Sequence, residues 1–297
     1  MDRKQISDTY QAIQEDFCDA LETLDGRSSF RTDVWERPGG GGGVTRIMSG
    51  SGPVEKAAVN FSAVEGDTPD RLSEQLAADS SHFVATGVSI IVHPANPHAP
   101  TFHANIRYFE TDSGHAWFGG GADLTPIYLY EEDARDFHSS LKAICDRHRV
   151  GDYSAWKSAC DDYFYLPHRG EARGIGGIFF DHLTERPEEV WSFQSDLGDS
   201  LGDIYFPIMR RRIDMAYGDR EREWQEVRRG RYAEFNLVWD RGTRFGLETA
   251  GRTESILASL PPQARWIYSY EPQSLTPEAT LVELIRGPPR SWAEQAG

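Results

Sequence analysis

Three polar side chains of different chemistry, His103, Asn105 and Arg107, alternate with apolar residues along the segment TFHANIRYFE at residues 101–110. Successive side chains of a β-strand point to opposite faces, so this alternation predicts a strand that carries all three on one face. An imidazole, an amide and a guanidinium then follow one another at steps of about 6.6 Å. A guanidinium presents a planar pair of donors that matches a carboxylate, so the pattern predicts a surface for a carboxylate-bearing ligand. A solvated outer face of an antiparallel sheet is the alternative.

Asp123 is a second candidate, because it closely follows three consecutive glycines that remove Cβ atoms from the chain. Residues 115–118 predict a strand, and Gly119, Gly120 and Gly121 come directly after it. Glycine allows a ligand to approach the backbone closely, so a flat, bulky ligand could lie over this turn with the carboxylate of Asp123 at its edge. The alternative is an ordinary turn in which Asp123 accepts a hydrogen bond from its own backbone.

Three further features bear on chemistry. Arg252 precedes a predicted helix at residues 254–259, where a cation and the backbone N–H groups would both attract an anion. His138 lies beside the apolar stripe of a predicted helix, which is more typical of a hydrogen-bonded core histidine than of a metal ligand. The five glycines at residues 39–43 lack the lysine of a phosphate-binding loop, so they predict a mobile loop between strands, with an active-site lid as the alternative. The glycines at residues 174–177 do not match the dinucleotide-binding pattern.

Hydrophobic periodicity outlines the elements that would hold these residues in place. A hairpin is predicted from residues 84–94 and 101–110, which a short Pro-rich link joins. Helices are expected at residues 6–24, 70–80, 131–148, 154–166, 187–217, 219–229, 254–259 and 277–286. Further strands are expected within residues 30–62, at 178–181, at 232–240 paired with 243–248, and at 265–270. The arginines of the two charged helices, Arg210 to Arg212 among them, are expected on a solvated face.

Composition narrows the classes of protein to consider. The chain has 297 residues, enough for one large domain, and its 31 basic and 47 acidic residues give a formal net charge of −16. This charge repels phosphate backbones and anionic membranes, so nucleic-acid binding is not expected. We find no apolar run long enough to span a bilayer and no signal-peptide pattern, so membrane insertion is not expected. The three cysteines show no CxxC spacing, which predicts free thiols in a reducing compartment and a soluble, cytoplasmic protein.

Nine short motifs are more specific as a set than any one of them alone. They are WERPGGGGG at residues 35–43, EKAAVNFS at 55–62, HPANP at 93–97, HANIRYF at 103–109, WFGGGADLTP at 117–126, HRG at 168–170, GIGGIFFD at 174–181, EFNLVWDRGT at 234–243 and GRTESIL at 251–257. Together they resemble the oxygen-dependent coproporphyrinogen-III oxidases, from residue 31 to the C-terminus. Two positions depart from the family pattern. Ala250 stands where the family usually has Gly, and His182 stands where a second Asp usually follows Asp181.

The resemblance implies an α+β fold in which a large, flat antiparallel β-sheet is sandwiched between α-helices on both faces. Residues 1–297 would form a single domain, with residues 1–26 as an N-terminal covering helix, and two copies would form a homodimer. The implied reaction is aerobic oxidative decarboxylation of the ring A and B propionates of coproporphyrinogen-III to vinyl groups, which gives protoporphyrinogen-IX in haem biosynthesis. Dioxygen would be the co-substrate and oxidant, with neither flavin nor NAD as a cofactor.

The family's functional positions carry over to residues of this chain. Substrate contacts would be made by Ser89, Asn105, Ile106, Arg107, Ala250, Gly251 and Arg252. The catalytic residues would be His103 as proton donor, Asp123 as the carboxylate that faces the pyrrole N–H groups, and Arg107. Metal positions proposed for bacterial members would be His93, His103, His138 and His168, with manganese as the first choice of divalent metal.

The chemistry of these residues is consistent with such a substrate. Coproporphyrinogen-III carries four carboxylates, so a protein of net charge −16 must bind it through local cations, and Arg107 and Arg252 are the best placed. Asp123 would stabilise or help to remove a proton as the ring is oxidised. A histidine such as His103 suits a proton donor, because the imidazole group in general exchanges protons near neutral pH.

Two other classes of function fit some of the same residues. Four histidines suit a mononuclear metal oxygenase, because imidazole binds iron, manganese or copper, although no carboxylate stands at the spacing of a facial triad. A tetrapyrrole carrier without catalytic activity would need the arginines, but neither Asp123 nor dioxygen. Oxygen uptake in the presence of substrate separates an oxidase from a carrier.

Overall fold

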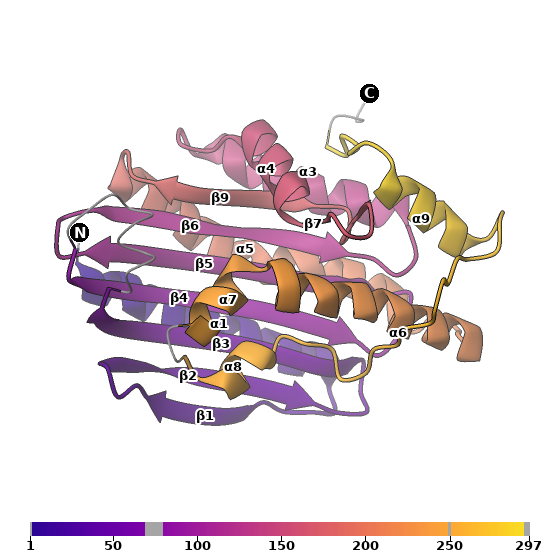
Figure 1. Cartoon of the computed structure of the whole chain (residues 1–297), viewed down its shortest axis with the longest axis horizontal. Helices are drawn as coiled ribbons and strands as arrows, with labels where there is room; N and C mark the ends of the chain where they lie inside the picture. The colour runs from indigo at the N-terminus through magenta and orange to yellow at the C-terminus, as the bar shows by residue number, and fades with distance from the viewer. Residues whose placement is uncertain (1, 69–79, 249–250, 294–297) are drawn as a thin grey trace.

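A computed structural model describes residues 2–68, 80–248 and 251–293, and its centre is one antiparallel sheet of seven strands (Figure 1). Neighbouring strands follow the order β1-β2-β3-β4-β5-β6-β9. Their bounds are β1 Arg31–Glu36, β2 Gly41–Ser49, β3 Val54–Asp67, β4 His82–Pro94, β5 Thr101–Thr111, β6 Ala116–Thr125 and β9 Gly177–Leu183. A separate small hairpin joins β7 Tyr165–Leu166 to β8 Glu171–Ala172. The helix expected at residues 70–80 lies outside the described residues, apart from Ser80.

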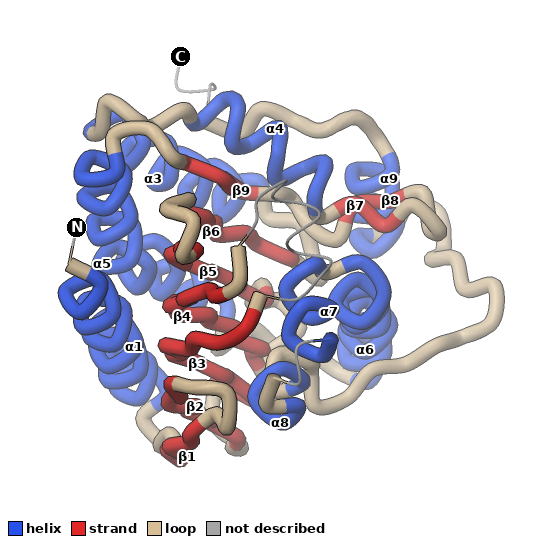
Figure 2. Tube along the Cα trace, turned by 60° about the vertical axis from the view of Figure 1, so that its left-hand side comes forward, coloured by secondary structure: helices blue, strands red, loops and turns tan. Residues whose placement is uncertain are grey.

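One face of the sheet is covered by α1 Arg3–Asp25, α3 Glu131–Arg147 and α5 Pro187–Arg212, while α4 Tyr153–Tyr163 packs along β9 (Figure 2). The strands turn their apolar side chains toward this layer, as Phe102, Ala104 and Ile106 of β5 do with no exposed surface. Helix α1 begins at the cap Asp2, which accepts from Lys4 N at 2.9 Å, and ends at Gly26 with φ +66°. The expected N-terminal covering helix is confirmed.

The opposite face is covered by α6 Asp219–Glu234, the π-helical turn η1 Phe235–Trp239, α7 Arg241–Glu248 and α8 Thr253–Leu257 (Figure 1). The last helix, α9 Pro277–Arg286, packs beside β8. Helices therefore lie on both faces of the antiparallel sheet, and the α+β sandwich that the resemblance implies is confirmed.

The strand pair expected from residues 232–240 and 243–248 is wrong, because this segment is helical. Its aromatic and β-branched residues suggested strands, but Tyr232 and Phe235 lie three residues apart and are both buried on the same side of the helix. Asp240 then starts α7, since its carboxylate accepts from Thr243 N at 2.6 Å. The closing strand expected at residues 265–270 is also absent, and Tyr268 there is 98% exposed.

The two glycine runs were expected in a loop and a turn, but most of their residues are in strands. The chain reverses at Gly40 and Gly41, where φ is +119° and +74°, and residues 41–43 already pair with β1 and β3. A Cβ atom at Gly43 would lie 2.5 Å from the ring of Trp35, so glycine there makes room for an aromatic side chain. The first run thus forms a tight hairpin turn and the start of β2, and residues 119–121 belong to the interior strand β6.

Several arginines expected on a solvated face are buried. Arg212 is 7% exposed, lies over the ring of Tyr130 and donates to both carboxylate oxygens of Asp133 at 2.8 and 3.0 Å. Arg228 and Arg229 of α6 are also buried, and they pair with Glu171 at 2.6 Å and Glu55 at 2.7 Å. Arg210 and Arg211 are exposed as expected.

Cys18, Cys145 and Cys160 are free thiols, and all three are buried. Within the described ranges, no helix is long and apolar enough to cross a membrane.

Candidate active site

The polar face of the sheet carries its side chains in rows that run across the strands. Register pairing sets one row, formed by Asp33, Thr45, Asn60, Ser89, Asn105 and Gly121. The neighbouring row is formed by Trp35, Gly43, Ser62, Gly87, Arg107 and Gly119. Adjacent strands lie about 4.8 Å apart, so the first row forms a polar band, whereas half of the second row is glycine and its polar members are Ser62 and Arg107. The prediction that His103, Asn105 and Arg107 share one face of a strand is confirmed by their partial exposure between buried neighbours.

Arg107 lies flat against this face because the residue opposite it on β6, Gly119, has no side chain. A Cβ atom at Gly119 would lie 2.9 Å from both Nε and Nη2 of Arg107. The guanidinium donates to Asn105 Oδ1 at 2.9 Å and pairs with Asp181 Oδ1 at 3.0 Å, and 35% of its side chain remains exposed. The glycine at this position therefore accommodates an arginine of the protein itself.

Asp123 is buried within β6, where it is opposite His103 in the register, and is only 2% exposed. The Nδ1–H of His103 donates to Oδ1 at 2.7 Å, and Arg173 donates to Oδ2 at 2.6 Å. Burial alone would raise the pKa of Asp123, but the charge of Arg173 and the hydrogen bond from His103 hold it below its ordinary value. Asp123 is thus an ionised carboxylate with both oxygens occupied, and neither expected turn conformation is present.

His103 is the member of this group that a ligand can reach. Its side chain is 23% exposed, and its Nε2 has no hydrogen-bond partner among the described residues. Asp123 holds the opposite nitrogen, Nδ1, in its protonated form, which leaves Nε2 to accept or return a proton at the polar face. The resemblance implies that Asp123 faces the pyrrole N–H groups of the substrate. In this structure His103 lies between the Asp123 carboxylate and the polar face.

Arg173 is a residue of this site that sequence reasoning missed. Its side chain is 1% exposed, and the guanidinium lies over the rings of Phe164, Tyr232 and Phe235 at 4.0, 4.6 and 4.7 Å from their centroids. It stands in a short segment between β8 and β9, so no period of the sequence marks it as buried. Sequence reasoning also missed Asp181. It lies two residues after Phe179 on β9, and alternation along the strand places both side chains on the polar face.

Arg252 lies at the far edge of the polar face and forms an ion pair with Asp33 of β1. Helix α8, which follows it, is tied to the sheet by Ser255, whose hydroxyl is 2.6 Å from Thr45 Oγ1 and whose carbonyl accepts from Asn60 Nδ2 at 2.9 Å. Gly251 lies two residues before this helix, next to the N-cap Arg252, and Ala250 lies outside the described residues.

The other implied substrate contacts are divided between the two faces. Ser89 is opposite Asn105 in the register and lies in the polar row. Ile106 has no exposed surface and belongs to the core beneath the sheet, so its side chain does not face the site.

Two of the four implied metal ligands are neutral core histidines. The hydroxyl of Tyr153 donates to His138 Nδ1 at 2.9 Å, and Nε2–H donates to the Ile175 carbonyl at 3.1 Å. Burial lowers the pKa of His138 to about 3. His93 is also fully buried and donates from Nε2 to the Ser259 carbonyl at 2.9 Å, and burial lowers its pKa well below the ordinary value.

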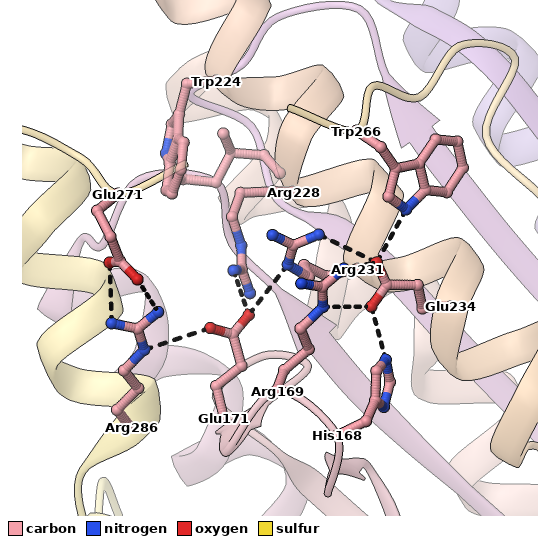
Figure 3. Close-up of polar contacts among 11 residues, drawn as sticks. His168, Arg169, Glu171, Trp224, Arg228, Arg231, Glu234, Trp266, Glu271 and Arg286 are labelled. Carbon is pink, nitrogen blue, oxygen red and sulfur yellow. Dashed lines mark hydrogen bonds and ion pairs between the residues drawn. The ribbon is translucent and has the colours of Figure 1, made fainter. Parts of the chain in front are cut away.

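His168 belongs to a charged network outside the polar face (Figure 3). It donates from Nε2 to Glu234 at 2.8 Å and accepts at Nδ1 from the indole of Trp239 at 3.0 Å. Burial alone would raise the pKa of Glu234, but the hydrogen bonds from Arg169, His168 and Trp266 lower it to about 2. The ring nitrogens of His168 are therefore engaged by protein groups.

These contacts do not fit the implied metal centre. In the parts of the chain that the structure describes, no three or more histidine, cysteine or carboxylate side chains are arranged to hold a metal ion. His93, His138 and His168 each bond to different protein groups, and only His103 lies at the polar face with an accessible nitrogen. Among the described residues, the four histidines are not brought together as one metal site, and we assign no chemical step to a metal.

His182, one of the two departures from the family pattern, has a structural explanation. Residues 181 and 182 together oppose Gly119, so they form a β-bulge in β9. His182 has φ +52°, and its ring stacks on Trp117 at 5.1 Å. Asp and His are both among the residues that tolerate this left-handed conformation better than most, so either one can occupy the position.

The fold and this site together define a class of protein, namely an α+β protein with a polar sheet face suited to a carboxylate-bearing ligand. A flat antiparallel sheet presents a polar face beneath a helical layer, with arginines suited to carboxylates and an accessible imidazole held by a buried carboxylate. Comparison with known proteins then identifies the family. The chain belongs to the coproporphyrinogen III oxidase family, whose sequence model matches residues 5–292.

Individual relatives cover nearly the whole chain. It is 45% identical to coproporphyrinogen-III oxidase 1, chloroplastic, of Arabidopsis thaliana, in an alignment that covers 98% of this chain and 79% of the relative. It is 46% identical to the oxygen-dependent coproporphyrinogen-III oxidase of Prochlorococcus marinus (strain MIT 9313), over 99% of this chain and 92% of the relative. The family resemblance inferred from the nine motifs is confirmed.

Proposed function

We propose that this protein catalyses the aerobic oxidative decarboxylation of the ring A and B propionates of coproporphyrinogen-III, giving protoporphyrinogen-IX. The family and the names of its relatives support this reaction. The structural observation that carries it is one polar sheet face with Arg107 and His103 on the same strand, β5, and Arg252 at the opposite edge. Four strand spacings, about 19 Å, separate β5 from β1, so a flat ligand with carboxylates on opposite edges would meet both arginines.

Binding of the substrate rests on these two cations. The guanidiniums of Arg107 and Arg252 would each take a peripheral carboxylate in a two-pronged contact. Asn105 and Ser89 lie between them on the sheet and present short polar groups to the ring. The ligand would then lie flat on the polar face beneath α7 and α8.

The chemical step requires the loss of carbon dioxide and two electrons from each propionate, together with one proton from the carbon that becomes part of the vinyl group. Dioxygen accepts the electrons. His103 would move the proton at Nε2, while the ionised Asp123 keeps Nδ1–H in place and stabilises the imidazolium. Asp123 would therefore act through His103 instead of contacting the pyrrole N–H groups directly.

Turnover with and without dioxygen tests the proposal. The purified protein should convert coproporphyrinogen-III to protoporphyrinogen-IX and release carbon dioxide only when dioxygen is present. Arg107→Met should raise KM roughly 10- to 100-fold, because it removes a charge-assisted contact. Arg210→Met, at an exposed position on α5, is the matched control and should leave KM unchanged. Tight binding without oxygen uptake would contradict the proposal and favour a tetrapyrrole carrier.

The homodimer and the cytoplasmic location expected from the sequence stay predictions. The Arabidopsis thaliana relative carries the word chloroplastic in its name, and the name of the Prochlorococcus marinus relative gives no location. Sedimentation of the purified protein over a range of concentrations tests the dimer directly.

A further inference from the structure

The backbone beneath Arg107 departs from a regular sheet. Arg107 is opposite Gly119 between β5 and β6, and on its other edge Gly119 faces the two-residue bulge of Asp181 and His182. A bulge leaves part of the hydrogen-bond ladder unpaired and turns a side chain in a new direction. Here it turns Asp181 toward Arg107, and the carbonyl of Gly119 accepts a hydrogen bond from a partner outside the sheet.

That partner is Gln194, which comes from α5 in the helical layer on the far side of the sheet. Its Nε2 donates to the Gly119 carbonyl at 2.9 Å and to the Arg107 carbonyl at 3.4 Å. Its Oε1 accepts from the hydroxyl of Tyr10 on α1. Gln194 and Tyr10 both have no exposed surface. The amide orientation follows from the chemistry, because a flipped amide would place Oε1 against two carbonyl oxygens.

We infer that Gln194 is a positioning residue for Arg107, acting through the carbonyls of Gly119 and of Arg107 itself. The amide of Gln194 joins the backbones of Arg107 and Gly119, which are opposite each other in the sheet. It therefore sets the direction in which the guanidinium of Arg107 points. The inference rests on the proposed function, in which Arg107 binds a substrate carboxylate. It adds that helices on the apolar face determine the geometry of the polar face.

The position of Arg107 is sensitive to such a change. Its side chain lies within van der Waals reach of Gly119, and its charge is shared with Asn105 Oδ1 and Asp181 Oδ1 at about hydrogen-bond distance. Without Gln194, the buried carbonyls of Gly119 and Arg107 lose this donor and move or admit water, and either event shifts the strand. A shift of about 1 Å at a binding group can cost a hundredfold in rate.

Gln14 offers a matched control within the same chain. It is also fully buried, lies on α1, and donates from Nε2 to two sheet carbonyls, Val44 at 2.8 Å and Val59 at 2.7 Å. Those carbonyls belong to β2 and β3, away from Arg107. Gln14→Met and Gln194→Met therefore remove the same donor from two sheet carbonyls. Gln194→Met should lower thermal stability more, because Gln194 Oε1 also accepts from Tyr10 whereas Gln14 Oε1 has no partner among the described residues.

Steady-state kinetics with coproporphyrinogen-III and dioxygen test the inference. Gln194→Met should raise KM roughly tenfold, whereas Gln14→Met should leave KM unchanged. Tyr10→Phe removes only the hydroxyl that holds the amide, and it should raise KM by a smaller factor. This variant keeps the test open if Gln194→Met does not fold. Equal KM values for wild type, Gln194→Met and Tyr10→Phe would overturn the inference.

Arg107→Lys separates failure of this inference from failure of the proposed function. If Gln194 acts through Arg107, Arg107→Lys raises KM, and the double variant with Gln194→Met is little worse than Arg107→Lys alone. If Arg107→Lys leaves KM unchanged, the proposed role of Arg107 fails. If Arg107→Lys raises KM, but the KM of the double variant shows that the effects of Arg107→Lys and Gln194→Met multiply independently, only the role of Gln194 is overturned.

Discussion

Removal of Arg173 is the most informative perturbation of the buried charges in this protein. Arg173→Met keeps an unbranched apolar side chain among the rings of Phe164, Tyr232 and Phe235, but it deletes the charge that faces Asp123. The two side chains are 1% and 2% exposed, so water cannot take over the role of the guanidinium. Breaking a buried pair by removing one partner typically costs about 3–5 kcal/mol.

The protonation of Asp123 sets an independent limit on this cost. A buried carboxylate without its cation can take up a proton, and at pH 7 this costs about 4 kcal/mol for an ordinary aspartate pKa of about 3.9. At pH 5 the same step costs only about 1.5 kcal/mol. In the wild type, the pKa of Asp123 is lowered, so the pair stabilises the fold above the unfolded pKa and this contribution is lost as the pH falls. The difference between wild type and Arg173→Met should therefore shrink by about 2–3 kcal/mol from pH 7 to pH 5.

Urea denaturation at pH 7 and pH 5, at one protein concentration, measures this difference. Arg3→Met is the control, since Arg3 pairs with Glu110 at the surface with 56% of its side chain exposed, and such a pair contributes at most about 1 kcal/mol. The double variant Asp123→Asn/Arg173→Met removes both charges and should be more stable than Arg173→Met alone at pH 7. A cost no larger than that of Arg3→Met, or one that grows as the pH falls, would refute the reasoning.

Two further predictions concern the roles of individual groups. Asp123→Asn should lower turnover about a hundredfold or more with little change in KM, because His103 loses the carboxylate that stabilises its charged form. Steady-state kinetics measure this effect, and nearly normal turnover would contradict the prediction. Chelation or added Mn²⁺ should leave the melting temperature unchanged, because His93, His138 and His168 bond to protein groups; a clear rise in calorimetric melting temperature with Mn²⁺ would show a native-state site that we have not recognised.

The strands and helices with a clear period could be predicted from the sequence. The alternation from His103 to Arg107 gave the polar face of β5, and the apolar stripe from Ile6 to Leu21 gave α1. These patterns are local, because a strand or helix with one buried face shows its period within its own residues. The nine motifs gave the family, and with it the sandwich of helices about an antiparallel sheet.

Residues 232–248 could not be predicted in the same way, because their partners are distant in sequence. Tyr232 and Phe235 are buried against Arg173, and Asp240 accepts from Tyr163. Aromatic residues favour strands in isolation, and tertiary packing overrides this preference when a helix presents them to a buried cation. The roles of Gly119 and Gln194 escaped prediction for a related reason. They depend on the register of β5 with β6, which places Gly119 opposite Arg107, and on the bulge at Asp181, and no single strand shows either feature.

The acidic composition of the chain and its proposed polyanionic substrate are compatible because of how the arginines at the site are paired. Arg107 and Arg252 each face one aspartate, Asp181 and Asp33, yet each keeps 35% of its side chain exposed. A guanidinium has five N–H donors, so an incoming carboxylate can bind to the exposed donors while the aspartate keeps its own. The aspartates thus hold both cations in place before the ligand arrives, and the entropy cost of ordering two long side chains is met during folding rather than during binding.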